Sequence, residues 1–152
     1  MRTLLAATSL LLLSSLSGLY AAATQEEVAQ AIQTFLKDPT SPEAKAAGKV
    51  IFTYSQETPD HEISIDEKAL PWLKSSGGSD RGTLLLVAFI SGDLQEQFRK
   101  GTGKPETYAG VLTVLSVYEK LKAKSSIYFD PNLEHFIDLE KNGKLKEFLE
   151  AK

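Results

Sequence analysis

The sequence predicts an all-α fold, a small multi-helix domain built of antiparallel helical hairpins in a layout like that of helical-repeat proteins. Apolar residues recur every three or four positions in several segments, which is the spacing of one helix face. Most of these segments begin at a capping residue or a proline and end at a proline or a glycine. The length allows a single domain to bury a sizeable core without disulfides, and the chain has no cysteine to form one.

The first predicted hairpin follows Thr24, which with Glu27 has the spacing of a capping box. Apolar residues at helical period follow, and residues 38–39 (Asp-Pro) end this helix. Ser41 begins the next helix as its N-cap, with Pro42 at the first helical position. Because only a few residues join the two helices, we expect them to pack antiparallel.

The segment 49–66 supports two interpretations. Residues 49–55 are rich in β-branched and aromatic side chains, and residues 61–66 alternate polar with apolar. With Thr-Pro-Asp between them, this pattern is also typical of a short β-hairpin. The well-capped start favours a helix that runs to about Glu57, and the β-hairpin is kept as the alternative.

Helical patterns return in the second half of the chain. Residues 83–90 are apolar all round, as expected of a central helix, and the pattern continues until Gly101 and Gly103 stop it. Further helices are predicted after Pro105, after residues 130–131 (Asp-Pro), and in a last short segment. This layout resembles that of the tetratricopeptide class, although the two hairpins do not align and the signature residues of that class are missing.

The serine- and glycine-rich stretch 75–79 is predicted to be a flexible loop and is the best internal boundary. Division there would leave two halves too small to fold well alone, so we predict one helical domain over residues 24–152. Just before this stretch, Pro71 is expected to break any continuing helix and to leave Trp72 packed inward, with partial exposure of Trp72 as the alternative.

Residues 1–23 read as a signal peptide. Arg2 gives a short positive start, residues 4–13 form an apolar run, and Ala21 and Ala23 have the small-x-small spacing of a cleavage site. We therefore predict an exported protein, periplasmic or secreted, that starts at Thr24. An uncleaved membrane anchor is the alternative, although this stretch reaches the length of a span only by including several serines and a glycine.

Composition argues against several classes of function. The net charge is −3 with both signs scattered along the chain, whereas nucleic-acid binders need a basic surface, so no nucleic-acid partner is predicted. Without cysteine there is no thiolate nucleophile, no cysteine metal site and no acylation site, and a bacterial origin is favoured. Once the signal is removed, no membrane association is expected.

Few residues offer recognisable chemistry. His135 and Asp138 share a helix face, but a catalytic zinc site usually takes three protein ligands, so we predict no metal site and no cofactor. Residues 101–104 (Gly-Thr-Gly-Lys) lack the remaining positions of a phosphate-binding loop and read as a helix stop. Several aromatic residues could line a groove but are expected mainly in the core: Tyr54, Trp72, Tyr108, Tyr118 and Tyr128.

These observations predict a non-catalytic helical module that contacts another protein, with no catalytic residues; the partner-binding residues and the oligomeric state are left open. The alternative is a small periplasmic hydrolase or ligand-binding protein that uses the acidic segment around His61. That segment holds His61 as a candidate base among four carboxylates, namely Asp60, Glu62, Asp66 and Glu67.

Overall fold

The computed structural model describes residues 22–76 and 78–151, and this part of the chain is all-helical. Most of the predicted signal peptide lies outside the described residues. The helices follow in the order α1 (Gln25–Lys37), α2 (Pro42–Glu57), α3 (Trp72–Ser76), α4 (Asp80–Lys100), α5 (Thr107–Lys124), η1 (Ser126–Tyr128), α6 (Pro131–Lys141) and α7 (Leu145–Glu150).

Helix starts follow the predicted capping chemistry. Thr24 and Glu27 form a complete capping box at α1, and the Ser41 side chain accepts from the Ala44 N–H at the start of α2. The Asp130 carboxylate accepts from the first N–H groups of α6. At the end of α4, Gly101 adopts a left-handed conformation with φ of 64°, which confirms the helix stop predicted there.

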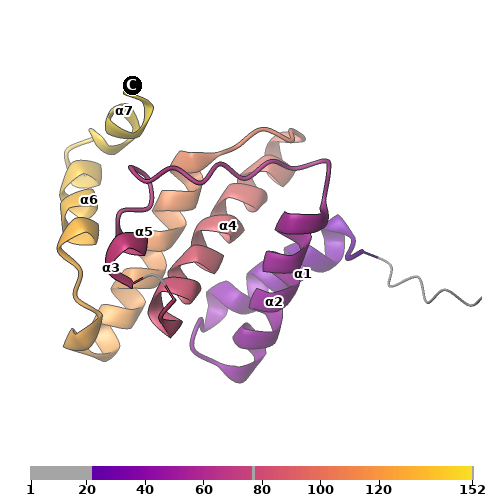
Figure 1. The fold of residues 1–152 in the computed structure, drawn as a ribbon, viewed down its shortest axis with the longest axis horizontal. Coiled ribbons are helices and arrows are strands. Elements are labelled where there is room, and N and C mark those ends of the chain that lie inside the picture. Colours follow the sequence, from indigo (N-terminus) through magenta and orange to yellow (C-terminus); the bar gives the residue numbers. More distant parts are fainter. Residues whose placement is uncertain (1–21, 77, 152) are drawn as a thin grey trace, which may run out of the picture.

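The β-hairpin kept as an alternative is not found in the described residues. Helix α2 runs to Glu57, and residues 58–66 extend across the ends of α4 and α5 without pairing as strands (Figure 1). The physical reason lies in the spacing of the buried side chains, since Ala47, Ile51 and Tyr54 bury one helix face. The β-branched Val50 and Thr53 fall on the exposed side of the same helix.

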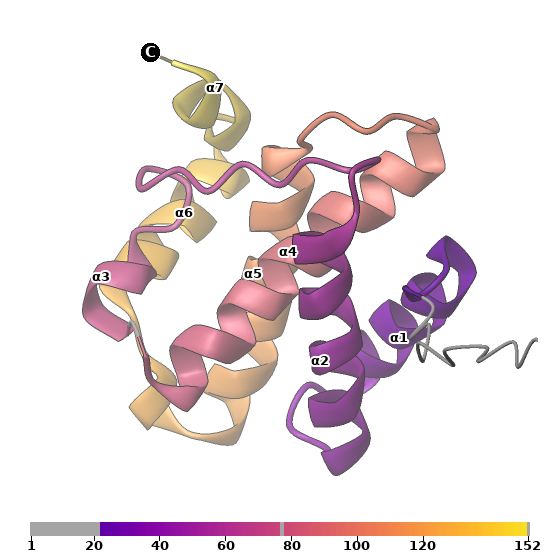
Figure 2. The ribbon, with the colours of Figure 1, turned by 45° about the vertical axis from the view of Figure 1, so that its right-hand side comes forward.

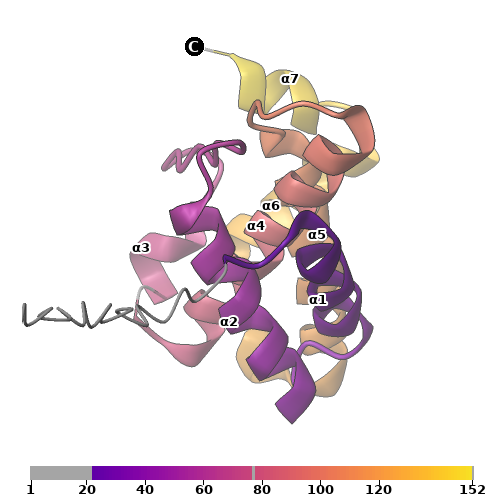
Figure 3. The same cartoon turned by 90° about the vertical axis from the view of Figure 1, so that its right-hand side faces the viewer.

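The central helix is α4, which packs against α1, α2, α3 and α5. Figure 3 shows α4 between α2 and α3 on one side and α1 and α5 on the other. Its fully buried side chains include Leu85, Ala88, Phe89 and Leu94, as expected from the apolar run at residues 83–90. Side chains from α1 to α7 contribute to one hydrophobic cluster around it.

Two glycines allow α4 and α5 to cross closely. A Cβ on Gly92 would lie 2.2 Å from Thr113 Oγ1 and 2.6 Å from the Ala109 carbonyl oxygen of α5. A Cβ on Gly110 would lie 2.8 Å from the Phe89 ring of α4. No side chain fits at either position without separating the helices. This crossing was not predicted from the sequence.

The stretch 71–79 differs from the prediction. Helix α3 begins directly after Pro71 and extends through Ser76, because a proline is tolerated at the start of a helix but not inside one. The Ser79 side chain then caps α4 by accepting from the Gly82 N–H, so the predicted loop is shorter. The prediction that Trp72 packs inward is confirmed, since its side chain is fully buried in the core, and the alternative of partial exposure is wrong.

Candidate functional site

A largely apolar groove runs between α2 and the N-terminal half of α4. Its volume is about 760 Å³. Figure 2 shows the two helices side by side, with their N-terminal ends further apart than their middles. The apolar residues that line the groove are Phe35, Pro39, Pro42, Ala44, Gly48, Phe52, Leu84, Leu86 and Val87.

Local sequence explains the shape of this groove. Small residues at positions 44 and 48 leave the α4-facing side of α2 without bulk, and a Cβ on Gly48 would lie 3.5 Å from Val87 Cγ1. The large rings of Phe35 and Phe52 line the groove beside them. Phe52 is 38% exposed, which is unusual for so large an apolar side chain in a well-packed domain.

The groove also carries charge. Its charged lining residues are Lys45 and Lys49 on α2 and Asp80 at the start of α4. Both lysines are exposed and lie four residues apart, hence on the same side of α2. Neither lysine forms an ion pair with another described residue. The α2 wall is therefore basic, although the chain as a whole has a net charge of −3.

A buried polar pair lies near the other end of α4. Asp93 and Gln97 are fully buried, and Asp93 Oδ1 accepts from Gln97 Nε2 at 2.6 Å and from the Glu106 N–H at 3.0 Å. Burial raises the pKa of the Asp93 carboxyl, while these two hydrogen bonds oppose the rise. Asp93 Oδ2 and Gln97 Oε1 have no hydrogen-bond partner among the described residues.

This pair explains why α5 starts as it does. The sequence predicts that Pro105 and Glu106 open that helix, but α5 begins at Thr107 and the Glu106 side chain does not cap it. The Asp93 carboxylate of the neighbouring helix accepts from the Glu106 N–H instead. Gln97 Nε2 also donates to the Glu62 carbonyl oxygen at 2.8 Å and so fastens the extended segment 58–66. The Asp93–Gln97 pair therefore holds the backbone of Glu106 and of Glu62 in place.

The structure places His61 in a packing role. Its Nδ1 lies 3.0 Å from the Tyr54 hydroxyl, and its ring meets Phe98 edge-on with centroids 5.0 Å apart. Asp66 accepts from the Lys68 N–H at 2.6 Å and so caps the short turn after the extended segment. Trp72 is buried in the core. These contacts do not gather His61, Asp66 and Trp72 into one pocket.

The other candidate residues are also accounted for by packing. The His135 ring packs against Phe136 and Phe148. Within residues 22–76 and 78–151, no three histidine, aspartate or glutamate side chains are placed to share a metal ion. Of the five aromatic residues that could line a groove, Tyr54, Trp72 and Tyr118 are buried, while Tyr108 and Tyr128 are half-buried.

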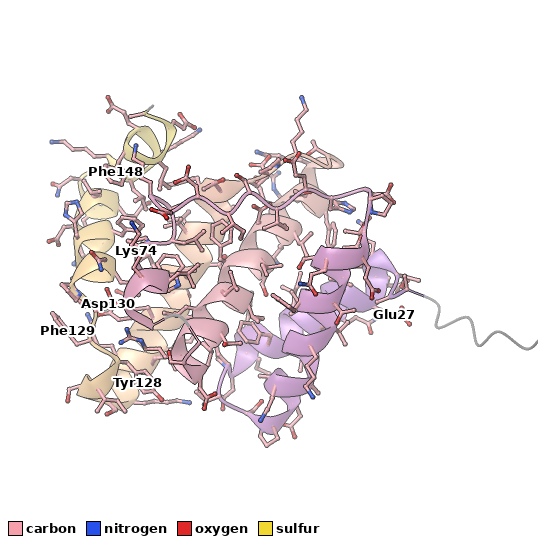
Figure 4. The ribbon with its side chains drawn as sticks, viewed as in Figure 1. Glu27, Lys74, Tyr128, Phe129, Asp130 and Phe148 are labelled. Carbon is pink, nitrogen blue, oxygen red and sulfur yellow. The ribbon has the colours of Figure 1, made fainter. Side chains whose placement is uncertain are left out.

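A second exposed apolar feature lies at the turn between α5 and α6. Phe129 is 58% exposed there and lies at the lower-left corner of Figure 4 beside Tyr128 and Asp130. The turn is fixed by the ion pair between Arg81 and the buried Asp130 carboxylate, at 3.1 Å. Burial and a hydrogen bond to Glu134 raise the pKa of Tyr118, beside this turn, to about 12. Phe129 does not line the α2–α4 groove.

Comparison of the chain with protein-family models, with curated proteins and with solved structures found no match. Among the described helices, none is both long and apolar enough to cross a membrane. The groove and the buried polar pair are the features that sequence reasoning missed. One signal was available for the groove, since Phe52 lies off the stripe that Ala47, Ile51 and Tyr54 form on α2.

Proposed function

We propose that this protein is an exported, non-catalytic helical module that binds another protein through the α2–α4 groove. The observation that carries the proposal is the groove itself, where exposed Phe52 adjoins a largely apolar lining. Contiguous exposed apolar surface with a polar rim marks protein-interaction sites in soluble proteins. Bulky aromatic side chains such as Phe52 are enriched at the centres of such interfaces.

The helix arrangement supports the proposal. We propose that α1 with α2 and α4 with α5 form the antiparallel hairpins of a repeat-like layout, since each pair is joined by a short connection and packs together. The groove lies between helices of two different hairpins. Grooves of this kind are common sites for peptide and helix recognition.

The start of α1 is compatible with the predicted cleavage site. Thr24, the first residue after the predicted cleavage site, is also the N-cap of α1, and its backbone nitrogen donates to Glu27 Oε2 at 2.7 Å. Cleavage after Ala23 would leave a charged amino group at this nitrogen, next to an acceptor carboxylate. The cut would therefore fall at the edge of the fold and leave α1 intact.

The hydrolase alternative has less support. His61 contacts the Tyr54 hydroxyl and the Phe98 ring, and none of its described contacts is to a carboxylate that could orient it as a base. His61 is also absent from the lining of the α2–α4 groove and of two further cavities, one beside α1 and one beside α7. We therefore propose no reaction for this segment.

Two exposed phenylalanines provide a matched test. The tagged exported protein is purified with its bound partner as wild type, as Phe52→Asp and as Phe129→Asp. We expect a stoichiometric partner with the wild type and with Phe129→Asp. With Phe52→Asp we expect at least a tenfold loss of recovered partner, because a carboxylate in the apolar groove would be buried by the partner at a cost. The N-terminus of the purified protein should be Thr24.

Thermal melting of both variants controls for folding, since both positions are already exposed and should change stability little. Loss of the partner with Phe129→Asp but not with Phe52→Asp would move the interface to the turn between α5 and α6. Equal recovery with all three proteins would refute binding through the groove.

A further inference from the structure

We infer that the partner segment seated in the α2–α4 groove is an amphipathic helix whose apolar stripe is flanked by acidic residues. This inference rests on the proposed protein-binding function and adds the chemistry of the partner. Three observations carry it, namely the nature of the groove walls, the length of the groove and the charge on its α2 wall.

The walls favour a helix over an extended segment. The two long walls are the helices α2 and α4, with Phe35 and residues 39–41 at one end of the groove. Most backbone N–H and C=O groups along the two helical walls are already paired within α2 and α4. An extended peptide between them would find few partners for its own backbone groups, which are costly to bury unpaired. A helix satisfies its backbone internally and offers only side chains to the groove.

The length of the groove fits about two turns of such a helix. The α2 wall runs from Pro42 to Phe52, which is about 15 Å at the helical rise of ~1.5 Å per residue. The α4 wall runs from Asp80 to Val87, which is about 10 Å by the same measure. Anchor residues at positions i, i+3 or i+4, and i+7 of a bound helix span about 10.5 Å. Three apolar anchors therefore match the lined stretch.

The positive charge on the α2 wall favours acidic residues beside the apolar stripe of the bound helix. Lys45 and Lys49 present two positive charges on one rim, and neither is neutralised by an ion pair with a described residue. Acidic residues beside the apolar stripe would face them. Charge complementarity of this kind raises the association rate and suppresses wrong partners. Binding should accordingly weaken as salt is added.

The test is a charge swap with two synthetic peptides. Both are 16-residue helices with leucines at i, i+4 and i+7, one flanked by glutamates and the other by lysines. Each is titrated by fluorescence anisotropy into the exported protein and into the Lys45→Glu, Lys49→Glu double variant. We expect the wild type to bind the glutamate peptide at least tenfold more tightly than the lysine peptide, and the double variant to reverse that preference.

A matched control carries the same change of net charge elsewhere. Lys141→Glu with Lys144→Glu alters two exposed lysines at the junction of α6 and α7, on the far side of α4 and α5 from α2 (Figure 1). This variant should keep the wild-type preference. If it loses the preference as well, the effect comes from overall charge and the inference about Lys45 and Lys49 is wrong.

Two further outcomes would overturn the inference. Binding of oleate together with no binding of either peptide would identify an acyl chain with an anionic head as the occupant. Equal binding of both peptides by wild type and double variant would exclude an acidic flank. If partner recovery still depends on Phe52 in either case, only the chemistry of the partner is refuted and the protein-binding function stands.

Discussion

Replacing Gly92 with alanine should destabilise the protein severely, whereas the same substitution at Gly48 should be tolerated or stabilising. A Cβ at position 92 would lie 2.2 Å from Thr113 Oγ1 and 2.6 Å from the Ala109 carbonyl oxygen, so α4 and α5 would have to separate. Such overpacking typically costs about 1–3 kcal/mol. Because a backbone atom blocks the site, we expect at least ~3 kcal/mol, a large part of a typical stability of about 5–15 kcal/mol.

Gly48 provides the control because it also lies inside a helix. Its Cβ would make an ordinary contact with Val87 Cγ1 at 3.5 Å. Alanine is favoured over glycine within helices by about 0.5–1 kcal/mol, so the melting temperature should stay the same or rise. Thermal unfolding followed by circular dichroism measures both variants. A Gly92→Ala protein that melts like the wild type would show that the α4–α5 crossing is less close than described.

The second large effect is expected at Asp93. Asp93→Leu would remove the acceptor of the Glu106 N–H and of one of the two Gln97 Nε2 hydrogen bonds, while the bond from Gln97 Nε2 to the Glu62 carbonyl oxygen remains. Each buried polar group left unpaired costs about 1–3 kcal/mol, so several kcal/mol of stability should be lost. Asp93→Asn keeps an acceptor oxygen for both donors. Its Nδ2 is expected to donate to Gln97 Oε1, which has no partner among the described residues.

The difference in stability between Asp93→Asn and the wild type should depend on pH. Burial raises the pKa of the Asp93 carboxyl in the folded chain above the ordinary value of 3.8. The folded state therefore binds the proton of Asp93 more tightly than the unfolded state does. The contribution of the protonated Asp93 carboxyl to stability is complete below pH 3.8. That contribution is lost as the pH rises through the folded-state pKa. Asparagine does not titrate, so the stability of Asp93→Asn relative to the wild type should rise over this pH range.

Urea unfolding of both proteins at several pH values from about 4 to 7 tests this expectation. The comparison with the wild type removes the contributions of the other titrating groups. We expect the difference in unfolding free energy to shift in favour of Asp93→Asn as the pH rises. A difference that stays constant with pH would mean that Asp93 titrates normally in the folded chain.

The helices themselves were largely predictable, because their signals are local. The start of α2 at Ser41 and Pro42 depends on neighbouring residues, and so does the end of α4 at Gly101. Both are predicted correctly from the sequence. The error at residues 75–79 has the opposite origin. A serine- and glycine-rich stretch looks like a loop in isolation, yet α3 extends through Ser76 and the Ser79 side chain caps α4.

The candidate site could not be predicted in the same way. Phe52 becomes a groove residue only because α4 passes beside α2 at an angle that leaves its ring half covered, and that angle follows from packing across the chain. Gly92 looks in the sequence like a weak helix residue, and its function as a crossing point appears only when α5 is in place. Asp93 offered one clue, since it lies on the same helix face as the apolar Phe89 and Ile90 one turn earlier.

The claim that the α2–α4 groove binds a protein is tested most directly by cross-linking from inside the groove in living cells. A photo-reactive phenylalanine analogue is placed at position 52, and a control is placed at Glu119 on the exposed side of α5. We expect one discrete protein adduct from position 52 and none from position 119. No adduct from position 52, or the same adduct from both positions, would contradict this claim.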